Sequence, residues 1–348
     1  MKNEIMKILF LQKVKTPKVK AFLPFYLFTL ILLSSCGLRQ QTSVVAAEPT
    51  EEPVGPTFCA DSAYAFCEQQ CAFGPRIMNS EAHDRCASWI ANKFQRYGLS
   101  VTTQHTNLRG YDGTTLRATN IIASYRPDLS ERVLVCAHWD SRPWADTDPD
   151  PANHRKPVMA ANDGASGVAV MLELARQLKS AGASVGIDFI CFDAEDWGTP
   201  QWSDVADAGN TWALGSQYWA ANPHVAGYKA RYGILLDMVG GQGAMFFKEG
   251  MSMQYAPDVA DRVWRAAQVV GFGSMFPNKP GTYITDDHAP VNTVAKIPCI
   301  DIIPYYPHCD QSSFGPTWHT VSDDMQHIDR TTLQAVGQTL IQVLYSEK

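Results

Sequence analysis

Short apolar runs, rich in β-branched residues and separated by helical patterns, constrain the fold of this 348-residue chain most strongly. Such runs are typical of strands that are buried on both faces. Their alternation with helical patterns predicts a single α/β domain, in which helices flank a mostly parallel, twisted central sheet. We find no internal repeat and no second domain. The strands are expected at residues 101–106, 119–125, 132–140, 186–196, 232–240 and 298–306, and the helices at residues 80–97, 164–179, 212–221, 257–270 and 331–345.

The N-terminal segment differs from the rest of the chain. Six lysines precede an apolar run at residues 21–33, which is short for a membrane span and suits the core of a signal peptide. "LSSCG" follows, and its Cys36 resembles the lipidated cysteine of bacterial lipoproteins. We expect a lipoprotein signal peptide over residues 1–35; the alternative is a soluble secreted protein that is cleaved nearby. An exported lipoprotein would be anchored through Cys36 on the periplasmic side of the envelope.

The segment after Cys36 is polar and rich in proline and glutamate, so residues 36–57 are expected to form a flexible tether. The remaining domain is expected at residues 58–348. The whole chain has a net charge of −6, and removing the +5 of residues 1–35 leaves −11. This charge, without a basic cluster beyond the signal segment, argues against nucleic acid as a partner. We expect a monomer that contacts the membrane only through its lipid.

Eight cysteines follow Cys36, and exported proteins can form disulfides. No CxxC pair or Cys/His finger spacing occurs, which argues against a cysteine zinc site. The cysteines inside apolar runs are expected to be buried thiols. A bridge is plausible in the N-terminal group, although no pairing can be assigned. The thiols expected to be buried are Cys136, Cys191 and Cys299; the candidates for a bridge are Cys59, Cys67, Cys71 and Cys86, with Cys309 also unassigned.

Carboxylates and imidazoles follow the predicted strands, at the sheet edge where α/β proteins bind ligands. Each has an ordinary structural reading; Asp163, for example, suits a helix cap. When these groups lie close together, repulsion between the carboxylates would lower the stability of the fold unless a cation lay between them. The mixture of imidazole nitrogen and carboxylate oxygen suits Zn²⁺ in a catalytic site with an open position. The residues are His138, Asp140, Asp163, Asp193, Glu195, Asp196, Asp237 and His319.

The adjacent Glu195 and Asp196 divide the chemistry between them. Neighbouring residues just past a strand point in different directions, so one can bind the metal while the other faces the substrate. A carboxylate beside a metal can act as a general base, and Glu195 has the longer side chain.

Six motifs resemble, in order and spacing, those of the zinc aminopeptidase superfamily, and within it those of the glutaminyl-peptide cyclotransferases, or glutaminyl cyclases, especially the bacterial ones. The motifs are "AHWDS", "NDGASG", "FDAEDWG", "ALGSQYW", "LLDMVG" and "WHT". The resemblance covers the chain from about residue 74 onward. It implies a zinc-exopeptidase-like α/β fold and an enzyme that converts the N-terminal glutamine of peptides or proteins to pyroglutamate with release of ammonia.

The resemblance also implies roles for individual residues. The zinc ligands would be Asp163, Asp196 and His319, although animal cyclases carry glutamate in place of Asp196. Glu195 would carry the proton, and Asp237 and Asp286 would hold the substrate amine and polarise the leaving group. Trp318 and His138 would contact the substrate, and Trp197 and Trp202 are candidates for a further tryptophan that closes over it. Animal forms carry a histidine where this chain has Asp301, which weakens any inference about a secondary hydrogen-bond network.

A two-zinc aminopeptidase is the main alternative, since His138, Asp163, Asp196, Asp237 and His319 are the ligand types that it needs. We expect one zinc ion, and a second through His138 and Asp237 remains open. "TDDHAP" and "WHT" favour the cyclase, and an indole at Trp318 suits a flat five-membered ring. A non-catalytic binding protein would be expected to lack Glu195 or a ligand, and this chain retains them all.

Overall fold

The computed structural model describes residues 51–204 and 211–348, so the predicted signal peptide, Cys36 and most of the tether lie outside the described residues. Glu51–Lys348 forms one compact unit. Its first residues lie against α8 (Arg330–Ser346): the Gln342 side chain accepts a hydrogen bond from the Val54 N–H at 2.7 Å and donates one to the Glu52 carbonyl at 3.3 Å. The structured domain therefore begins before Phe58, the boundary expected from the sequence.

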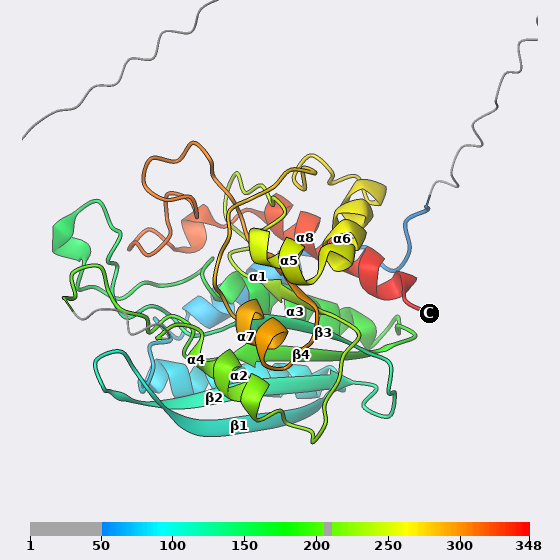
Figure 1. Ribbon diagram of the computed structural model, residues 1–348, viewed down its shortest axis with the longest axis horizontal. Coiled ribbons are helices and arrows are strands. Elements are labelled where there is room, and N and C mark those ends of the chain that lie inside the picture. Colours follow the sequence, from blue (N-terminus) through cyan, green and yellow to red (C-terminus); the bar gives the residue numbers. More distant parts are fainter. Residues whose placement is uncertain (1–50, 205–210) are drawn as a thin grey trace, which may run out of the picture. The chain divides into compact units, whose positions relative to one another are not determined.

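A six-stranded sheet forms the centre of the described domain, with strand order β1-β2-β4-β3-β5-β6. The four strands from β4 to β6 in this order are parallel to one another, whereas β1 and β2 form an antiparallel hairpin at one edge (Figure 1). The predicted α/β domain is confirmed, and its sheet is mixed. The strands are β1 (Ser100–Arg109), β2 (Thr115–Tyr125), β3 (Arg132–His138), β4 (Gly186–Phe192), β5 (Gly233–Leu236) and β6 (Cys299–Ile302).

Helices cover both faces of the sheet. Val133 and Val135 of β3 pack into the larger core with residues of α1, α2, α3, α6 and α8, while Leu134 and Cys136 face a smaller core with α4 and α7. All seven residues of β3 and of β4 are buried, as continuous apolar runs predict. The further helices are α1 (Ala60–Cys71), α2 (Glu81–Arg96), α3 (Ala165–Leu178), α4 (Leu214–Ala221), α5 (Gly250–Tyr255), α6 (Pro257–Val269) and α7 (His288–Thr293).

The cysteines of the described domain are all free thiols, so the bridge suggested for the N-terminal group is not formed. The expectation that Cys136, Cys191 and Cys299 are buried is confirmed. Among the described helices, none is both long and apolar enough to cross a membrane.

Candidate active site

A cavity of about 270 Å³ opens at the carboxyl ends of the parallel strands. It brings together most of the site residues expected from the sequence, and apolar side chains also line it. His138 lies beside the cavity, at the end of β3. The cavity is lined by Asp163, Glu195, Trp212, Asp237, Met238, Ile284, Thr285, Asp286, Ile303, Phe314, Trp318 and His319.

Asp163, Asp196 and His319 form a buried group whose ligand atoms all lie within 4.8 Å of one another. The Nε2 atom of His319 lies 3.5 Å from Asp163 Oδ2 and 3.2 Å from Asp196 Oδ1. In a tetrahedral zinc site with bonds of about 2.0–2.1 Å, neighbouring ligand atoms are about 3.3 Å apart. The observed spacing therefore fits three ligands of one zinc ion, and the donor set is the mixed imidazole and carboxylate set that catalytic zinc sites use.

The loop before α3 is built to present Asp163. The Asp323 carboxylate accepts hydrogen bonds from the Asn162 N–H at 2.8 Å and the Asp163 N–H at 3.0 Å. Gly164 follows with φ +131°, and a Cβ atom there would come within 2.8 Å of the His138 ring. Only glycine tolerates this backbone conformation and this close approach. The aspartate at the mouth of the helix thus projects into the site, and it does not cap α3.

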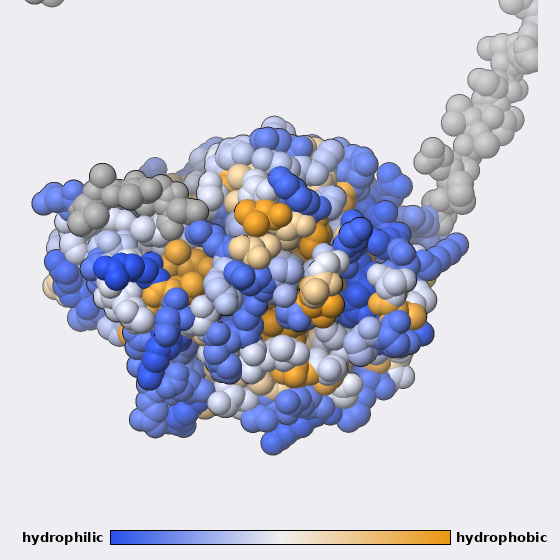
Figure 2. Space-filling view, turned by 60° about the horizontal axis from the view of Figure 1, so that its bottom comes forward, coloured by the Kyte–Doolittle hydropathy of each residue, from blue (hydrophilic) through white to orange (hydrophobic). Residues whose placement is uncertain are grey.

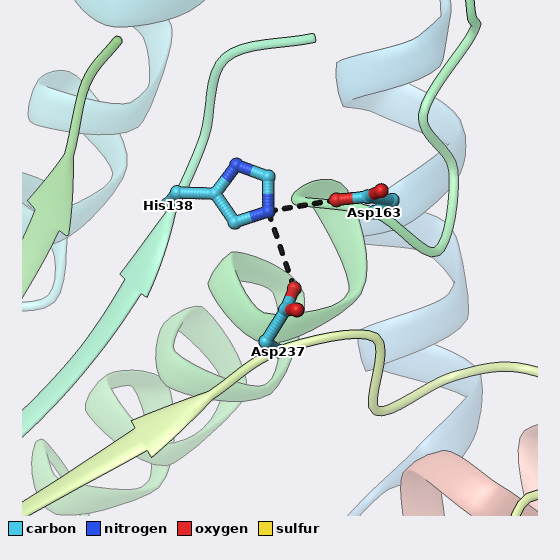
Figure 3. Close-up of side chains that lie close together, drawn as sticks. All are labelled: His138, Asp163 and Asp237. Carbon is cyan, nitrogen blue, oxygen red and sulfur yellow. Dashed lines mark hydrogen bonds and ion pairs between the residues drawn. The ribbon is translucent and has the colours of Figure 1, made fainter. Parts of the chain in front are cut away.

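His138, Asp163 and Asp237 form a second group, which shares Asp163 with the first (Figure 3). His138 Nε2 lies 2.9 Å from Asp163 Oδ1 and 3.2 Å from Asp237 Oδ1. Burial opposes protonation of His138, but contacts with Asp140, Asp163 and Asp237 outweigh burial and raise its pKa well above the usual value. The same side chains offer a position for a second metal ion.

Two carboxyl groups in the cavity have strongly raised pKa values. Burial raises the pKa of Glu195 well above its usual value, and the charges of Asp196 and Asp286 raise it further. Burial likewise raises the pKa of Asp237 to about 8, with added repulsion from Asp286 and Asp163. Carboxyl groups that keep or exchange a proton near neutral pH are suited to general acid and base catalysis.

A buried polar cluster lies behind Asp286. The Oδ2 atom of Asp286 and both carboxyl oxygens of Asp301 have no hydrogen-bond partner among the described residues. His288, the histidine of "TDDHAP", approaches this cluster with Nδ1 4.0 Å from Asp301 Oδ2, and its Nε2 lies 3.2 Å from Glu249 Oε2. His288 therefore places an imidazole beside Asp301, and this residue was not singled out from the sequence.

Aromatic side chains form the cavity wall. The Trp318 ring stacks on His319 with centroids 3.8 Å apart, and the Trp212 ring lies nearly parallel to the same imidazole at 6.0 Å. Trp197 and Trp202 do not line this cavity; their rings pack against Trp144 at 5.5 and 5.9 Å. Trp212 was missed from the sequence, although it directly precedes the motif "ALGSQYW".

Comparison with known proteins shows strong similarity to one family. The model of peptidase family M28 matches residues 120–344. The glutaminyl cyclase of Bacteroides thetaiotaomicron, solved with bound N-acetylhistamine, is 51% identical with a TM-score of 0.83, covering 84% of this chain and 99% of that one. The glutaminyl cyclase of Tannerella forsythia is 53% identical with a TM-score of 0.82, covering 84% and 100%. A Zn-dependent exopeptidase from Parabacteroides distasonis is 50% identical with a TM-score of 0.83, covering 84% and 100%.

More distant curated relatives include both kinds of enzyme. Aminopeptidase YwaD of Bacillus subtilis is 30% identical over 63% of this chain, and the glutaminyl-peptide cyclotransferase of Bothrops jararaca is 24% identical over 64%. The matched region spans 41% and 63% of the lengths of these two relatives, respectively. The predicted resemblance to bacterial glutaminyl cyclases of the zinc aminopeptidase superfamily is confirmed.

Proposed function

The chain belongs to peptidase family M28, and on that premise we propose that it is a zinc-dependent glutaminyl cyclase, which converts the N-terminal glutamine of peptides or proteins to pyroglutamate and releases ammonia. One observation supports this function above all: a small cavity walled by Trp212 and Trp318 holds Glu195 beside the group of possible zinc ligands. Glutaminyl cyclases at 51% and 53% identity support it as well.

Asp163, Asp196 and His319 would hold one zinc ion, which would act as a Lewis acid on the γ-carbonyl group of the substrate glutamine. Glu195 would take a proton from the α-amine of the substrate as this amine attacks the γ-carbonyl carbon of the same glutamine. Glu195 would then give this proton to the departing ammonia. Asp237 and Asp286 face the same cavity and would hold the α-amine.

Orientation and exclusion of water would account for much of the remaining rate enhancement. The nucleophile is already part of the substrate, so the cavity needs only to hold the amine near the carbonyl carbon. The Trp212, Phe314 and Trp318 rings leave a narrow apolar space that suits a flat five-membered ring. Keeping water out would also protect the same carbonyl from hydrolysis.

A two-zinc aminopeptidase is the second candidate. The group formed by His138, Asp163 and Asp237 favours it, because a second metal ion could bind there while sharing Asp163 with the first. The name of the Bacillus subtilis relative points the same way. In that enzyme, Glu195 would activate a metal-bound water for peptide hydrolysis.

We also propose that the protein is an exported bacterial lipoprotein that is anchored through Cys36 at the periplasmic side of the envelope and acts as a monomer. The lysine-rich segment, the apolar run and "LSSCG" support the anchor. On the face shown in Figure 2, hydrophobic side chains form small groups separated by polar ones, which is compatible with a monomer.

Incubation of the purified domain, residues 51–348, with peptides that begin with glutamine, leucine or alanine tests the proposal. Mass spectrometry should find loss of one ammonia from the glutamine peptide and no shortening of the others. The reaction should stop with a heterocyclic chelator, with N-acetylhistamine and in Glu195→Gln. Removal of the first residue from the leucine or alanine peptide would instead identify an aminopeptidase and contradict the proposed cyclase.

A further inference from the structure

A buried arginine connects two of the possible zinc ligands. Arg142, which is 1% exposed, follows β3 in the long polar segment at residues 141–157. Its Nη1 donates to the Asp196 backbone carbonyl at 3.1 Å and to Asp196 Oδ1 at 3.3 Å. Its Nε and Nη2 form two 2.6 Å hydrogen bonds with the Asp146 carboxylate. The Arg142 guanidinium therefore binds both the backbone and the side chain of Asp196.

The partner of this arginine faces the other ligand. Asp146 Oδ1 lies 3.6 Å from His319 Nδ1, the ring nitrogen opposite the one that faces Asp163 and Asp196. A carboxylate on that side fixes the ring orientation of a metal-bound histidine and increases its basicity. Asp146 is 3% exposed, and burial of its charge is balanced by Arg142.

The residues after Asp146 hold the backbone around His319. The Thr147 N–H donates to the His319 carbonyl at 3.2 Å, and the Thr147 hydroxyl donates to the Trp318 carbonyl. Asp148 Oδ2 accepts a hydrogen bond from the Val321 N–H at 3.0 Å. His319 has φ +53°, a left-handed conformation that is unfavourable for a residue with a side chain and persists only where its surroundings enforce it.

The same guanidinium also supports the cavity wall. Its central carbon lies 4.7 Å from the centroid of the Trp212 ring and 5.4 Å from that of Trp144. A planar cation that lies over each of two indoles makes favourable contacts that a lysine would not reproduce.

We propose that Arg142 and Asp146 are positioning residues that fix Asp196 and His319 relative to each other before zinc binds, and that Arg142 also fixes Trp212. The two ligands come from loops more than 100 residues apart, and this ion pair contacts both. Preorganised ligands bind a metal more tightly, because binding need not pay for ordering them. The inference rests on the proposed zinc site, although it does not depend on which reaction that site catalyses.

Zinc affinity measured without substrate tests the proposal. We would compare the wild-type domain with Arg142→Lys, Arg142→Met, Asp146→Asn and the double variant Arg142→Met/Asp146→Asn, using competition with a chromophoric zinc chelator. Asp150→Asn is the matched control, since Asp150 lies in the same segment but is exposed and caps a short 3₁₀ helix (Pro151–Asn153). Loss of such supporting contacts weakens metal binding about 10–100-fold, so Arg142→Met should raise the Kd for zinc by that factor. Arg142→Lys should lie between it and the wild type, and Asp150→Asn should be unchanged.

The melting temperature of the metal-free domain separates positioning from stability alone. If Arg142→Met does not fold, the double variant removes both buried charges and should fold while still binding zinc weakly. Arg142→Lys keeps the charge and serves as a further folded variant. A wild-type Kd for zinc in any folded Arg142 variant would overturn the proposal, whatever its melting temperature. A wild-type domain without cyclase activity would contradict the proposed function and leave these zinc affinities as a separate result.

Discussion

Glu195 and Asp196 share one anchor: the carboxylate of Asp140 accepts both of their backbone N–H groups, each at 3.1 Å. From this common anchor, Glu195 lines the cavity while the Asp196 carboxylate lies 3.2 Å from His319 Nε2. The two side chains for which the sequence predicts different roles therefore diverge from a third carboxylate just after β3.

Replacing Asp140 should disturb both residues at once. In Asp140→Asn, one of the two accepting oxygens becomes an amide group that donates, so one buried N–H loses its partner. We expect a loss of stability of about 2 kcal/mol, because an unsatisfied buried group costs about 1–3 kcal/mol. Chemical denaturation of the metal-free domain measures this loss, and kcat should fall with it. Unchanged stability and kcat would show that Asp140 does not anchor the pair.

Glu195→Gln should separate catalysis from metal binding. The variant keeps the shape of the side chain but cannot take up a proton, so kcat should fall by about 10²–10⁴-fold, the usual contribution of a general acid or base. Zinc content, measured by elemental analysis, should be unchanged, because Glu195 is outside the group formed by Asp163, Asp196 and His319. Asp196→Asn provides the contrast and should lose zinc as well as activity. Loss of zinc in Glu195→Gln would make Glu195 a ligand.

Glu249 links α5 to the cluster behind Asp286. Its side chain accepts hydrogen bonds from the backbone N–H groups of Met251, Ser252 and Ile284 and lies beside His288. Burial alone would raise its pKa, but the hydrogen bond and charge of His288, together with the backbone donors, lower it from 4.5 to about 2.

Because the pKa of Glu249 is lower in the folded state, its contribution to stability is fully present above the unfolded value near 4.5 and is lost as pH falls toward about 2. The shift corresponds to at most about 3 kcal/mol. Glu249→Gln should therefore be less stable than the wild type at pH 6, and the difference should shrink toward pH 2. Denaturant unfolding at several pH values measures it, with the exposed Glu68→Gln as control. A difference that does not depend on pH would assign the effect to the loss of an accepting oxygen and not to the loss of charge.

The elements with a clear periodic signal could be predicted from the sequence. The buried runs that became β3, β4 and β5 and the helical pattern of α3 were found, and so were the acidic residues at their ends. The missed elements have weak or short patterns. α1 buries a single large apolar residue, Phe66, beside the small or polar Ala63, Cys67 and Gln70, and α5 and α7 have only six residues each.

The contacts around the site were harder to predict, because they join residues far apart in the chain. Asp146 meets His319, and Arg142 meets Trp212, through packing that no local pattern records. The sequence marked residues 141–157 only as a long polar connection, without a role for any of its side chains. Likewise, Trp197 and Trp202 were suggested for the cavity wall and Trp212 was not, although the fold brings Trp212 beside the imidazole of His319.

Trp212 and Trp202 allow a sharp test of the cavity wall. Trp212 lines the cavity, whereas Trp202 packs against Trp144, His154 and Arg155 outside it. Trp212→Leu should widen the cavity and admit water, so KM for a glutamine peptide should rise about 10-fold or more, as expected for loss of a large apolar contact of about 1.5–3 kcal/mol. Trp202→Leu is the matched control, and its KM should stay near the wild-type value.

Steady-state kinetics of both variants at saturating zinc decide between the tryptophans. Hydrolysis of the substrate side chain to glutamate, detected by mass spectrometry, should appear only in Trp212→Leu, because that variant alone opens the wall beside Glu195. The reverse result, with Trp202→Leu impaired and Trp212→Leu normal, would mean that Trp202 moves over the substrate during catalysis. It would also return the role of the closing tryptophan to one of the two residues that the family resemblance suggested.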